Sequence, residues 1–267
     1  MKSMNILKSR VTVILVLLLV PMFLIQVLPS LIYMTGVNIV MSSIVASFAT
    51  ILLSLLFSKK VCDRDMTNYF PKPGVFIICG ILMVVFLMID QTLFLWISNH
   101  ITDPGMTART DAIGSMDLES NMIWYLLYAV IVAPVAEECL FRIGLYRYLK
   151  RSFSWMTALV ASSVMFGLIH MTISHLVTAT LFGMLLCLIL ERTKCIWITI
   201  ICHMWYNFCT LFVPTDAMSG LASHTVITVL VFFGIVYLLA VGMLKQDARF
   251  RDERDEESIN KSSGGLS

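Results

Sequence analysis

MIWYLLYAVIVAPVAEECLFR, residues 122–142, is the stretch of sequence that decides the fold. It carries no charged side chain from Met122 to Ala136, and it then presents two adjacent glutamates followed by an arginine. A helix of roughly 20 mostly apolar residues is long enough to cross a bilayer. The stretch therefore predicts a membrane-spanning helix that carries ionisable side chains within or close to the hydrocarbon core of the bilayer.

Apolar runs of similar length recur along the whole chain. Hydrophobic residues make up 58% of the sequence and charged residues 13%, whereas soluble domains carry about 25% charged residues. Eight runs predict spanning helices: 11–34, 37–57, 75–97, 122–141, 155–171, 175–190, 195–213 and 225–244. We therefore expect an all-α, polytopic membrane protein with a bundle of about eight transmembrane helices.

The distribution of charge predicts how the chain crosses the membrane. Lysine and arginine gather in alternate connections between the runs, and such connections mark the cytoplasmic side. The basic residues of these connections are Lys2, Lys8, Arg10, Lys59, Lys60, Arg64, Lys72, Arg147, Lys150, Arg151, Arg192, Lys194, Lys245, Arg249 and Arg251. The remaining connections carry Arg109 and mostly acidic side chains. We therefore predict a multi-pass protein of a cell membrane, in contact with lipid, with both termini cytoplasmic.

A single transmembrane domain is expected over residues 1–245. Its first apolar run follows basic residues, as in a signal peptide, but it exceeds the ~7–15 apolar residues of such a signal, so we predict a retained helix. Residues 246–267 are charged and then rich in Ser and Gly, which predicts a disordered cytoplasmic tail. The net charge of +2, without a basic stripe, gives no reason to expect a nucleic-acid partner.

The first unusual polar group in the spans is the pair Glu137 and Glu138 with Arg142. Glu138 and Arg142 are four residues apart, so they share a helix face and can form an ion pair. Glu137 points about 100° away from Glu138 because a helix turns once every 3.6 residues. One glutamate can then be structural while the other faces a cavity. The alternative is that both are interfacial charges at a helix end.

Two further motifs place histidine within apolar runs. Phe166 and His170 share one helix face, and so do His203 and Asn207 on a later run. Ionisable groups in membrane spans usually face the bundle interior and mark function. Helix–helix hydrogen bonding is the structural alternative for His203 and Asn207. Asp90, within the run 75–97, is interpreted as a helix–helix hydrogen-bond partner or a cavity-lining residue.

Depth connects the first two motifs. If the helix of Glu137 continues to about residue 151 and turns at 152–154, Glu137 and His170 each lie about 25 Å from the turn, at ~1.5 Å per residue. A helical hairpin would then place these two side chains side by side. Pro134 predicts a kink just before the site, and Ser162, Ser163 and Gly167 allow close helix approach.

This arrangement suggests hydrolysis inside the membrane. A carboxylate and an imidazole, here Glu137 and His170, can activate a water molecule, while His203 and Asn207 can donate hydrogen bonds to an oxyanion. Glu137, His170 and His203 also form a possible Zn²⁺ ligand set with an open fourth position. The sequence lacks the H-E-x-x-H arrangement of zinc proteases, so we favour a metal-free site with no cofactor.

The three motifs together resemble those of the CAAX protease and bacteriocin-processing family of intramembrane proteases, also called Abi or CPBP. The resemblance covers about residues 121–211. It implies a helical bundle around an intramembrane catalytic cavity, with Glu137 and His170 activating water and His203 and Asn207 forming the oxyanion hole. It also implies that Glu138, Arg142 and Phe166 orient the site. Members have long been described as metalloproteases.

The resemblance implies a glutamate-dependent endopeptidase that cleaves a peptide or a membrane-anchored protein. Bacterial members are linked to bacteriocin self-immunity and peptide maturation, and the compact chain resembles this bacterial group. Two alternatives remain open. The first is a non-catalytic immunity or scaffold protein that retains the fold. The second is a transporter, which predicts two matching halves with interrupted helices; the sequence contains no such pair of halves.

Overall fold

A computed structural model describes residues 19–61, 73–107 and 118–211, and these residues form helices joined by short connections. The helices are η1 (Phe23–Val27), α2 (Leu28–Tyr33), α3 (Ile39–Val61), α4 (Pro73–His100), α6 (Leu118–Leu127), η2 (Tyr128–Val132), α7 (Ala133–Glu138), η3 (Cys139–Tyr146), α8 (Arg147–Ser152), α9 (Trp155–Leu168), α10 (Ile173–Thr193) and α11 (Ile196–Thr210). The segments labelled η are π-helical. No strand occurs within the described ranges.

The helices confirm the all-α membrane fold. Within the described residues, each predicted run from 11–34 to 195–213 contains a helix, whereas the run 225–244 and the tail 246–267 lie outside them. Among the described residues, three helices are long and apolar enough to cross a membrane by themselves: Ile39–Lys59, Pro73–His100 and Ile173–Thr193. Their outer faces expose large apolar side chains such as Phe48, Leu52 and Ile81. Such extended apolar surface is suited to lipid and not to water.

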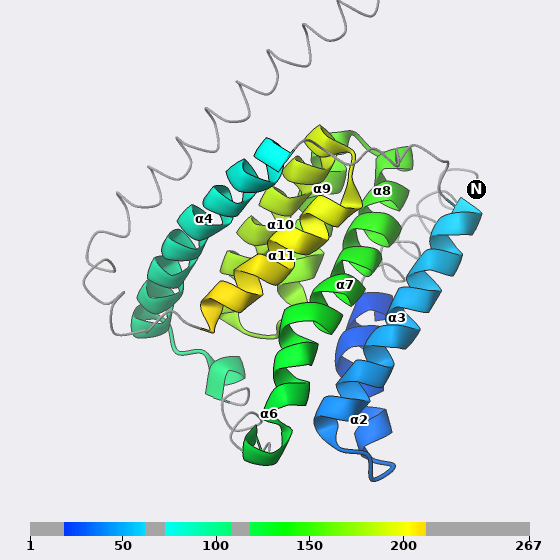
Figure 1. Ribbon diagram of the computed structural model, residues 1–267, viewed down its shortest axis with the longest axis vertical. Coiled ribbons are helices and arrows are strands. Elements are labelled where there is room, and N and C mark those ends of the chain that lie inside the picture. Colours follow the sequence, from blue (N-terminus) through cyan, green and yellow to red (C-terminus); the bar gives the residue numbers. More distant parts are fainter. Residues whose placement is uncertain (1–18, 62–72, 108–117, 212–267) are drawn as a thin grey trace, which may run out of the picture.

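The segments α6 to α8 follow one another directly and form one long helix through the middle of the molecule (Figure 1). This helix packs against α3 on one side and against α9 and α11 on the other. α10 packs against α4, α9 and α11. The predicted continuation of the helix beyond residue 141 is therefore confirmed, as is the turn after Ser152. The residues of the first motif lie in the interior because helices cover the long helix on both sides.

Polar contacts at the helix ends agree with the predicted alternation of connections. Lys150, at the end of the long helix, pairs with Glu191 near the end of α10, and Lys194 pairs with the same carboxylate at 2.5 Å. At the other end of the molecule, Asp103 accepts hydrogen bonds from the first residues of α10. Connections predicted on the same membrane side are thus neighbours. Which side is cytoplasmic stays a prediction.

The long helix changes its hydrogen-bonding pattern just before the glutamates. Pro134 lies at the start of α7, directly after the π-helical segment η2. Proline donates no backbone hydrogen bond, and π-helical turns often occur at functional sites. A second π-helical segment, η3, begins at Cys139. The glutamates therefore lie between two widened turns.

α9 and α10 form a tightly packed hairpin. A Cβ atom on Gly183 would lie 3.1 Å from the Cβ atom of Ser163, and one on Gly167 would overlap Leu176 O and the Thr180 hydroxyl. Small residues allow helices in a membrane to approach this closely. Ser163 and Gly167 thus allow a close approach between α9 and α10; the predicted close approach of these small residues to the helix of Glu137 stays a prediction.

We predict that Gly167→Ala lowers the stability of the purified protein. The added Cβ has no room against the α10 backbone, so the hairpin must open, at a cost of about 1–3 kcal/mol. Gly80→Ala is the matched control, because Gly80 has no neighbouring atom within 4 Å of an added Cβ. Thermal unfolding in detergent should show a lower Tm for Gly167→Ala than for Gly80→Ala. Equal Tm values would contradict the tight packing.

Candidate active site

A completely buried ion pair forms the base of the site. Glu138 and Arg142 are 0% and 1% exposed, and the Arg142 Nε atom lies 3.2 Å from Glu138 Oε2. The Arg142 guanidinium lies 4.8 Å from the centre of the Phe166 ring and donates to the Gly183 backbone oxygen at 3.4 Å. The predicted i, i+4 pairing of Glu138 with Arg142 is therefore present, and it joins the long helix to α9 and α10.

His203 joins this pair from α11. Its Nδ1 atom lies 3.0 Å from Glu138 Oε1, and an ionised carboxylate only accepts hydrogen bonds. Nδ1 therefore carries a proton and donates it, which fixes the orientation of the ring. The rings of Phe166 and Phe182 meet the imidazole edge-on, with centroids 5.9 Å and 5.0 Å away. The second nitrogen, Nε2, faces Glu137 Oε2 at 3.7 Å.

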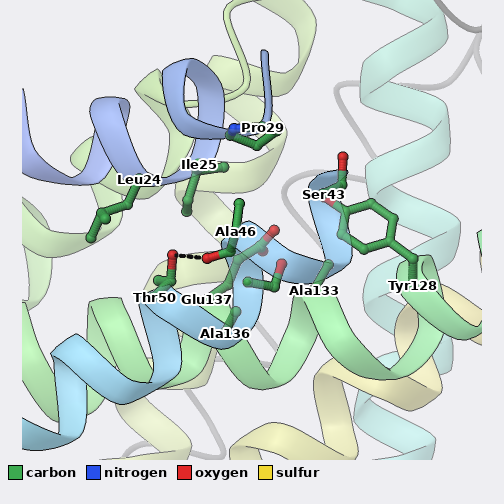
Figure 2. Close-up of a pocket in the computed structure, with 11 residues that line it drawn as sticks. Leu24, Ile25, Pro29, Ser43, Ala46, Thr50, Tyr128, Ala133, Ala136 and Glu137 are labelled. Carbon is green, nitrogen blue, oxygen red and sulfur yellow. Dashed lines mark hydrogen bonds between the residues drawn. The ribbon is translucent and has the colours of Figure 1, made fainter. Parts of the chain in front are cut away.

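Glu137 has a different environment from its neighbour. Its side chain is 16% exposed, against 0% for Glu138. It lines a small pocket of about 10 Å³, which is room for about one water molecule, between the long helix, α3 and the first described helix (η1 and α2), as Figure 2 shows. One glutamate is thus buried in an ion pair and the other faces a cavity, as the helical geometry predicts.

Hydroxyl groups of α3 form the polar wall of this pocket. Ser43, Ser47 and Thr50 line it together with Glu137, opposite Leu24 and Ile25 of the first helix. The Ser43 and Thr50 hydroxyls donate to the carbonyls of Ile39 and Ala46 in their own helix, at 2.9 Å and 2.8 Å. Each hydroxyl has one hydrogen, so these two groups offer only lone pairs to the pocket.

Sequence reasoning missed this wall. Its signal is nevertheless present, because residues 43, 47, 50 and 54 are all Ser or Thr and recur with the spacing of one helix face. Serine and threonine are common in apolar membrane helices, where they bond back to their own backbone. The Ser/Thr pattern of α3 therefore indicates a pocket wall only once the structure places it beside Glu137.

His170 lies in the turn after α9. The predicted run 155–171 is therefore too long by a few residues, since α9 ends at Leu168. His170 Nδ1 lies 2.9 Å from Phe166 O, so Nδ1 donates and the neutral ring has its lone pair on Nε2. The rings of Phe166 and His170 meet edge-on with centroids 5.1 Å apart. Phe166 thus links His170 to the cluster; that His170 shares a water molecule with Glu137 stays a prediction.

Asn207 lies one turn after His203 and bonds to the long helix. Its Nδ2 atom donates to the Ala129 backbone oxygen at 2.9 Å, within the π-helical segment η2. This contact matches the helix–helix hydrogen bond that was the structural alternative for Asn207. A role of Asn207 in an oxyanion hole stays a prediction.

Asp90 ties α4 to α11, which confirms the helix–helix hydrogen bond considered for it. The Tyr206 hydroxyl donates to Asp90 Oδ2 at 2.6 Å, and the Tyr206 ring stacks on Phe182 at 4.3 Å. Phe182 in turn packs on His203. Tyr206 therefore supports His203 indirectly through Phe182, a contact that sequence reasoning did not predict.

The donor groups do not form an obvious metal centre. Across residues 19–61, 73–107 and 118–211, no three His, Cys, Asp or Glu side chains are grouped so as to hold a metal ion. The possible zinc set of Glu137, His170 and His203 is therefore not grouped as a metal site in these ranges, although the bond from His203 Nδ1 to Glu138 leaves Nε2 able to bind a metal. Metal-free catalysis stays a prediction.

The segment that holds these residues is similar to known proteins. Residues 119–209 match the sequence model of the family described as Type II CAAX prenyl endopeptidase Rce1-like. The curated Bacillus subtilis protein named "Putative membrane peptidase YdiL" is 31% identical over 99 residues, which are 37% of this chain and 40% of that protein. The chain therefore spans less than half the length of this relative. No solved structure matches the chain. Residues 119–209, which include all seven residues of the three motifs, are therefore similar to the Rce1-like CAAX endopeptidase family, as the motifs indicate.

Proposed function

We propose that the protein is a membrane-embedded endopeptidase in which Glu137 activates the water that cleaves a peptide bond. The observation that supports this proposal is that the two adjacent carboxylates have different environments. Glu137 lines a pocket, while Glu138 is buried against Arg142 and His203. A structural ion pair alone does not account for a second carboxylate that faces a cavity beside a fixed imidazole.

Charge balance assigns a protonation state to the cluster. Two carboxylates and one guanidinium leave one negative charge, and unbalanced charge in a low-dielectric interior is costly. A proton on each nitrogen of His203 makes the group of Glu137, Glu138, Arg142 and His203 neutral. Nε2 then carries a hydrogen toward Glu137. One water molecule beside the pair can contact both Nε2 and Oε2, since these atoms are only 3.7 Å apart.

The reaction follows from these positions. Water bound at Glu137 attacks the carbonyl carbon of the scissile amide, and its proton passes to the Glu137 carboxylate. The carbonyl oxygen becomes an oxyanion, which His203 Nε2–H stabilises. Glu137 then gives its proton to the amide nitrogen, the C–N bond breaks, and Glu137 returns to its carboxylate form. His170, with its lone pair on Nε2, assists as a second base, and Asn207 adds a polar group near the oxyanion.

The pocket favours a peptide substrate at the membrane. Its polar wall of Ser43, Thr50 and Glu137 offers hydrogen-bond acceptors, which suit water and backbone N–H groups, while Leu24 and Ile25 supply apolar contact. The similarity to peptidases supports a peptide or membrane-anchored protein as the substrate class. Peptide maturation or bacteriocin self-immunity in a bacterial membrane is the biological setting that we propose.

We predict that Glu137→Gln abolishes cleavage while the fold is retained. Glutamine keeps the size of the side chain but cannot take the proton from water, so kcat should fall by about 10³-fold or more. The measurement is cleavage of fluorescein-labelled casein and of candidate membrane peptides by the full chain in lipid nanodiscs. Glu191→Gln is the control, because Glu191 is remote from the pocket and pairs with Lys150 and Lys194.

The same variant separates the enzyme from a non-catalytic protein. A peptidase loses its cellular phenotype with Glu137→Gln at unchanged abundance. An immunity or scaffold protein keeps its phenotype in this variant. Retention of both phenotype and cleavage would end the proposed role of Glu137.

We predict that Arg142→Met destabilises the protein by about 3–5 kcal/mol, because it leaves Glu138 buried without its cation. Lys150→Met is the matched control, since Lys150 pairs with Glu191 but is 39% exposed, and exposed pairs contribute about 0–1 kcal/mol. Denaturant unfolding in detergent measures both. An Arg142→Met protein as stable as Lys150→Met would contradict the structural role of the ion pair.

We predict that metal chelation leaves cleavage intact. Treatment with 1,10-phenanthroline followed by dialysis should not change kcat, because Glu137 and His203 activate water by themselves in the proposed reaction. Loss of activity that Zn²⁺ restores would show that a metal is required and would overturn the metal-free reaction.

A further inference from the structure

The turn that carries His170 is short and conformationally unusual. It connects the end of α9 at Leu168 to the start of α10 at Ile173. Met171 has a positive φ of 59°, which is uncommon for a residue with a side chain. Such backbone persists only when its surroundings hold it in place. The contacts that hold this turn come from two distant segments of the chain.

The first contact comes from the loop after α4. Asp103 Oδ2 accepts hydrogen bonds from the backbone N–H groups of Ile173 and Ser174, at 2.7 Å and 3.2 Å. Its other oxygen accepts from Gly105 N at 3.1 Å and from Met106 N at 3.3 Å. One carboxylate thus binds the start of the helical turn 104–107 to the first turn of α10, and four N–H groups donate to it.

Backbone packing strengthens this contact. A Cβ atom on Gly105 would overlap the Met171 carbonyl oxygen, so the loop backbone lies directly against the turn. Only glycine allows this approach. The loop after α4 therefore covers the residue next to His170.

The second contact comes from the first helix. Gln26, within the π-helical segment η1, donates from Nε2 to the Ile169 backbone oxygen at 2.5 Å. Ile169 lies at the C-terminus of α9, where carbonyls lack partners within the helix. Gln26 thus holds the residue on the other side of His170.

We infer that Gln26 and Asp103 are positioning residues that fix the His170 imidazole for the reaction. They bind the chain immediately before and shortly after His170, and neither belongs to the three motifs. The inference rests on the proposed function for its catalytic consequence. His175 reports on the same turn, because its ring stacks on that of His170 at 5.9 Å and its Nδ1 bonds to the Thr172 hydroxyl at 2.7 Å.

The test replaces each contact separately in the full chain. Gln26→Leu removes the amide donor, and Asp103→Ala removes the carboxylate. Misplacement of a catalytic group by about 1 Å can cost about 10²-fold in rate. We expect kcat to fall by about 10-fold to 100-fold in each variant, with KM changed by less than about 3-fold. Asp103→Asn, which keeps one acceptor oxygen, should retain more activity than Asp103→Ala.

A spectroscopic measurement separates positioning from general stability. In protein labelled with ¹⁵N-histidine, with the His170 signals assigned from His170→Gln, both variants should shift or broaden the signals of His170 and His175. The His203 signals should stay in place, because His203 is held by Glu138. His100→Gln is the control, since His100 bonds within its own helix end to Trp96 O and lies next to the loop.

The outcomes decide the inference without reference to activity. Unchanged His170 signals in the folded variants would overturn it, and so would equal shifts of the His170 and His203 signals. If Asp103→Ala fails to fold, Gln26→Leu decides the question from the other segment. A wild-type protein without peptidase activity would refute the proposed function, whereas the His170 signals would still test the positioning.

Discussion

The buried ion pair of Glu138 and Arg142 is the interaction on which the rest of the site depends. Moving two charges out of water and away from lipid headgroups costs free energy. The attraction between the two charges offsets this cost only when their geometry is good and further hydrogen bonds are present. Both partners have these further contacts: His203 lies against Glu138, while Phe166 and the Gly183 carbonyl lie against Arg142. The pair therefore requires α9, α10 and α11 to meet the long helix at one level.

This requirement explains why the second carboxylate, Glu137, faces the pocket. Successive residues of a helix point about 100° apart, so burial of Glu138 turns Glu137 toward the other side of the long helix. There α3 and the first helix leave a pocket with a polar wall. Adjacent residues of the helix thus have two environments, the buried ion pair on one side and the pocket of the proposed reaction on the other. His203 connects the two environments because its two nitrogens face the two carboxylates.

Local patterns in the sequence predict the helices and the ion pair, but not the contacts between distant segments. Apolar runs predict the helices, and i, i+4 spacing predicts the pairing of Glu138 with Arg142. Local patterns do not contain the contact between Gln26 and Ile169, which are separated by 143 positions. They also do not show that Asn207 bonds to the carbonyl of Ala129, since the π-helical turn that presents this carbonyl has no distinct apolar pattern. The end of α9 was misplaced because apolar residues continue through the turn, while backbone geometry ends the helix.

Two hydrogen bonds on one face of α11 determine how this helix can move. His203 bonds to Glu138, and Asn207, one turn further along, bonds to Ala129 on the same long helix. Two anchors about 6 Å apart along a helix axis resist both sliding and rotation, whereas a single anchor would still act as a pivot. α11 and the long helix therefore behave as one rigid wall. Widening of the site without loss of either anchor is left to α3 and the first helix, which form the opposite side of the pocket.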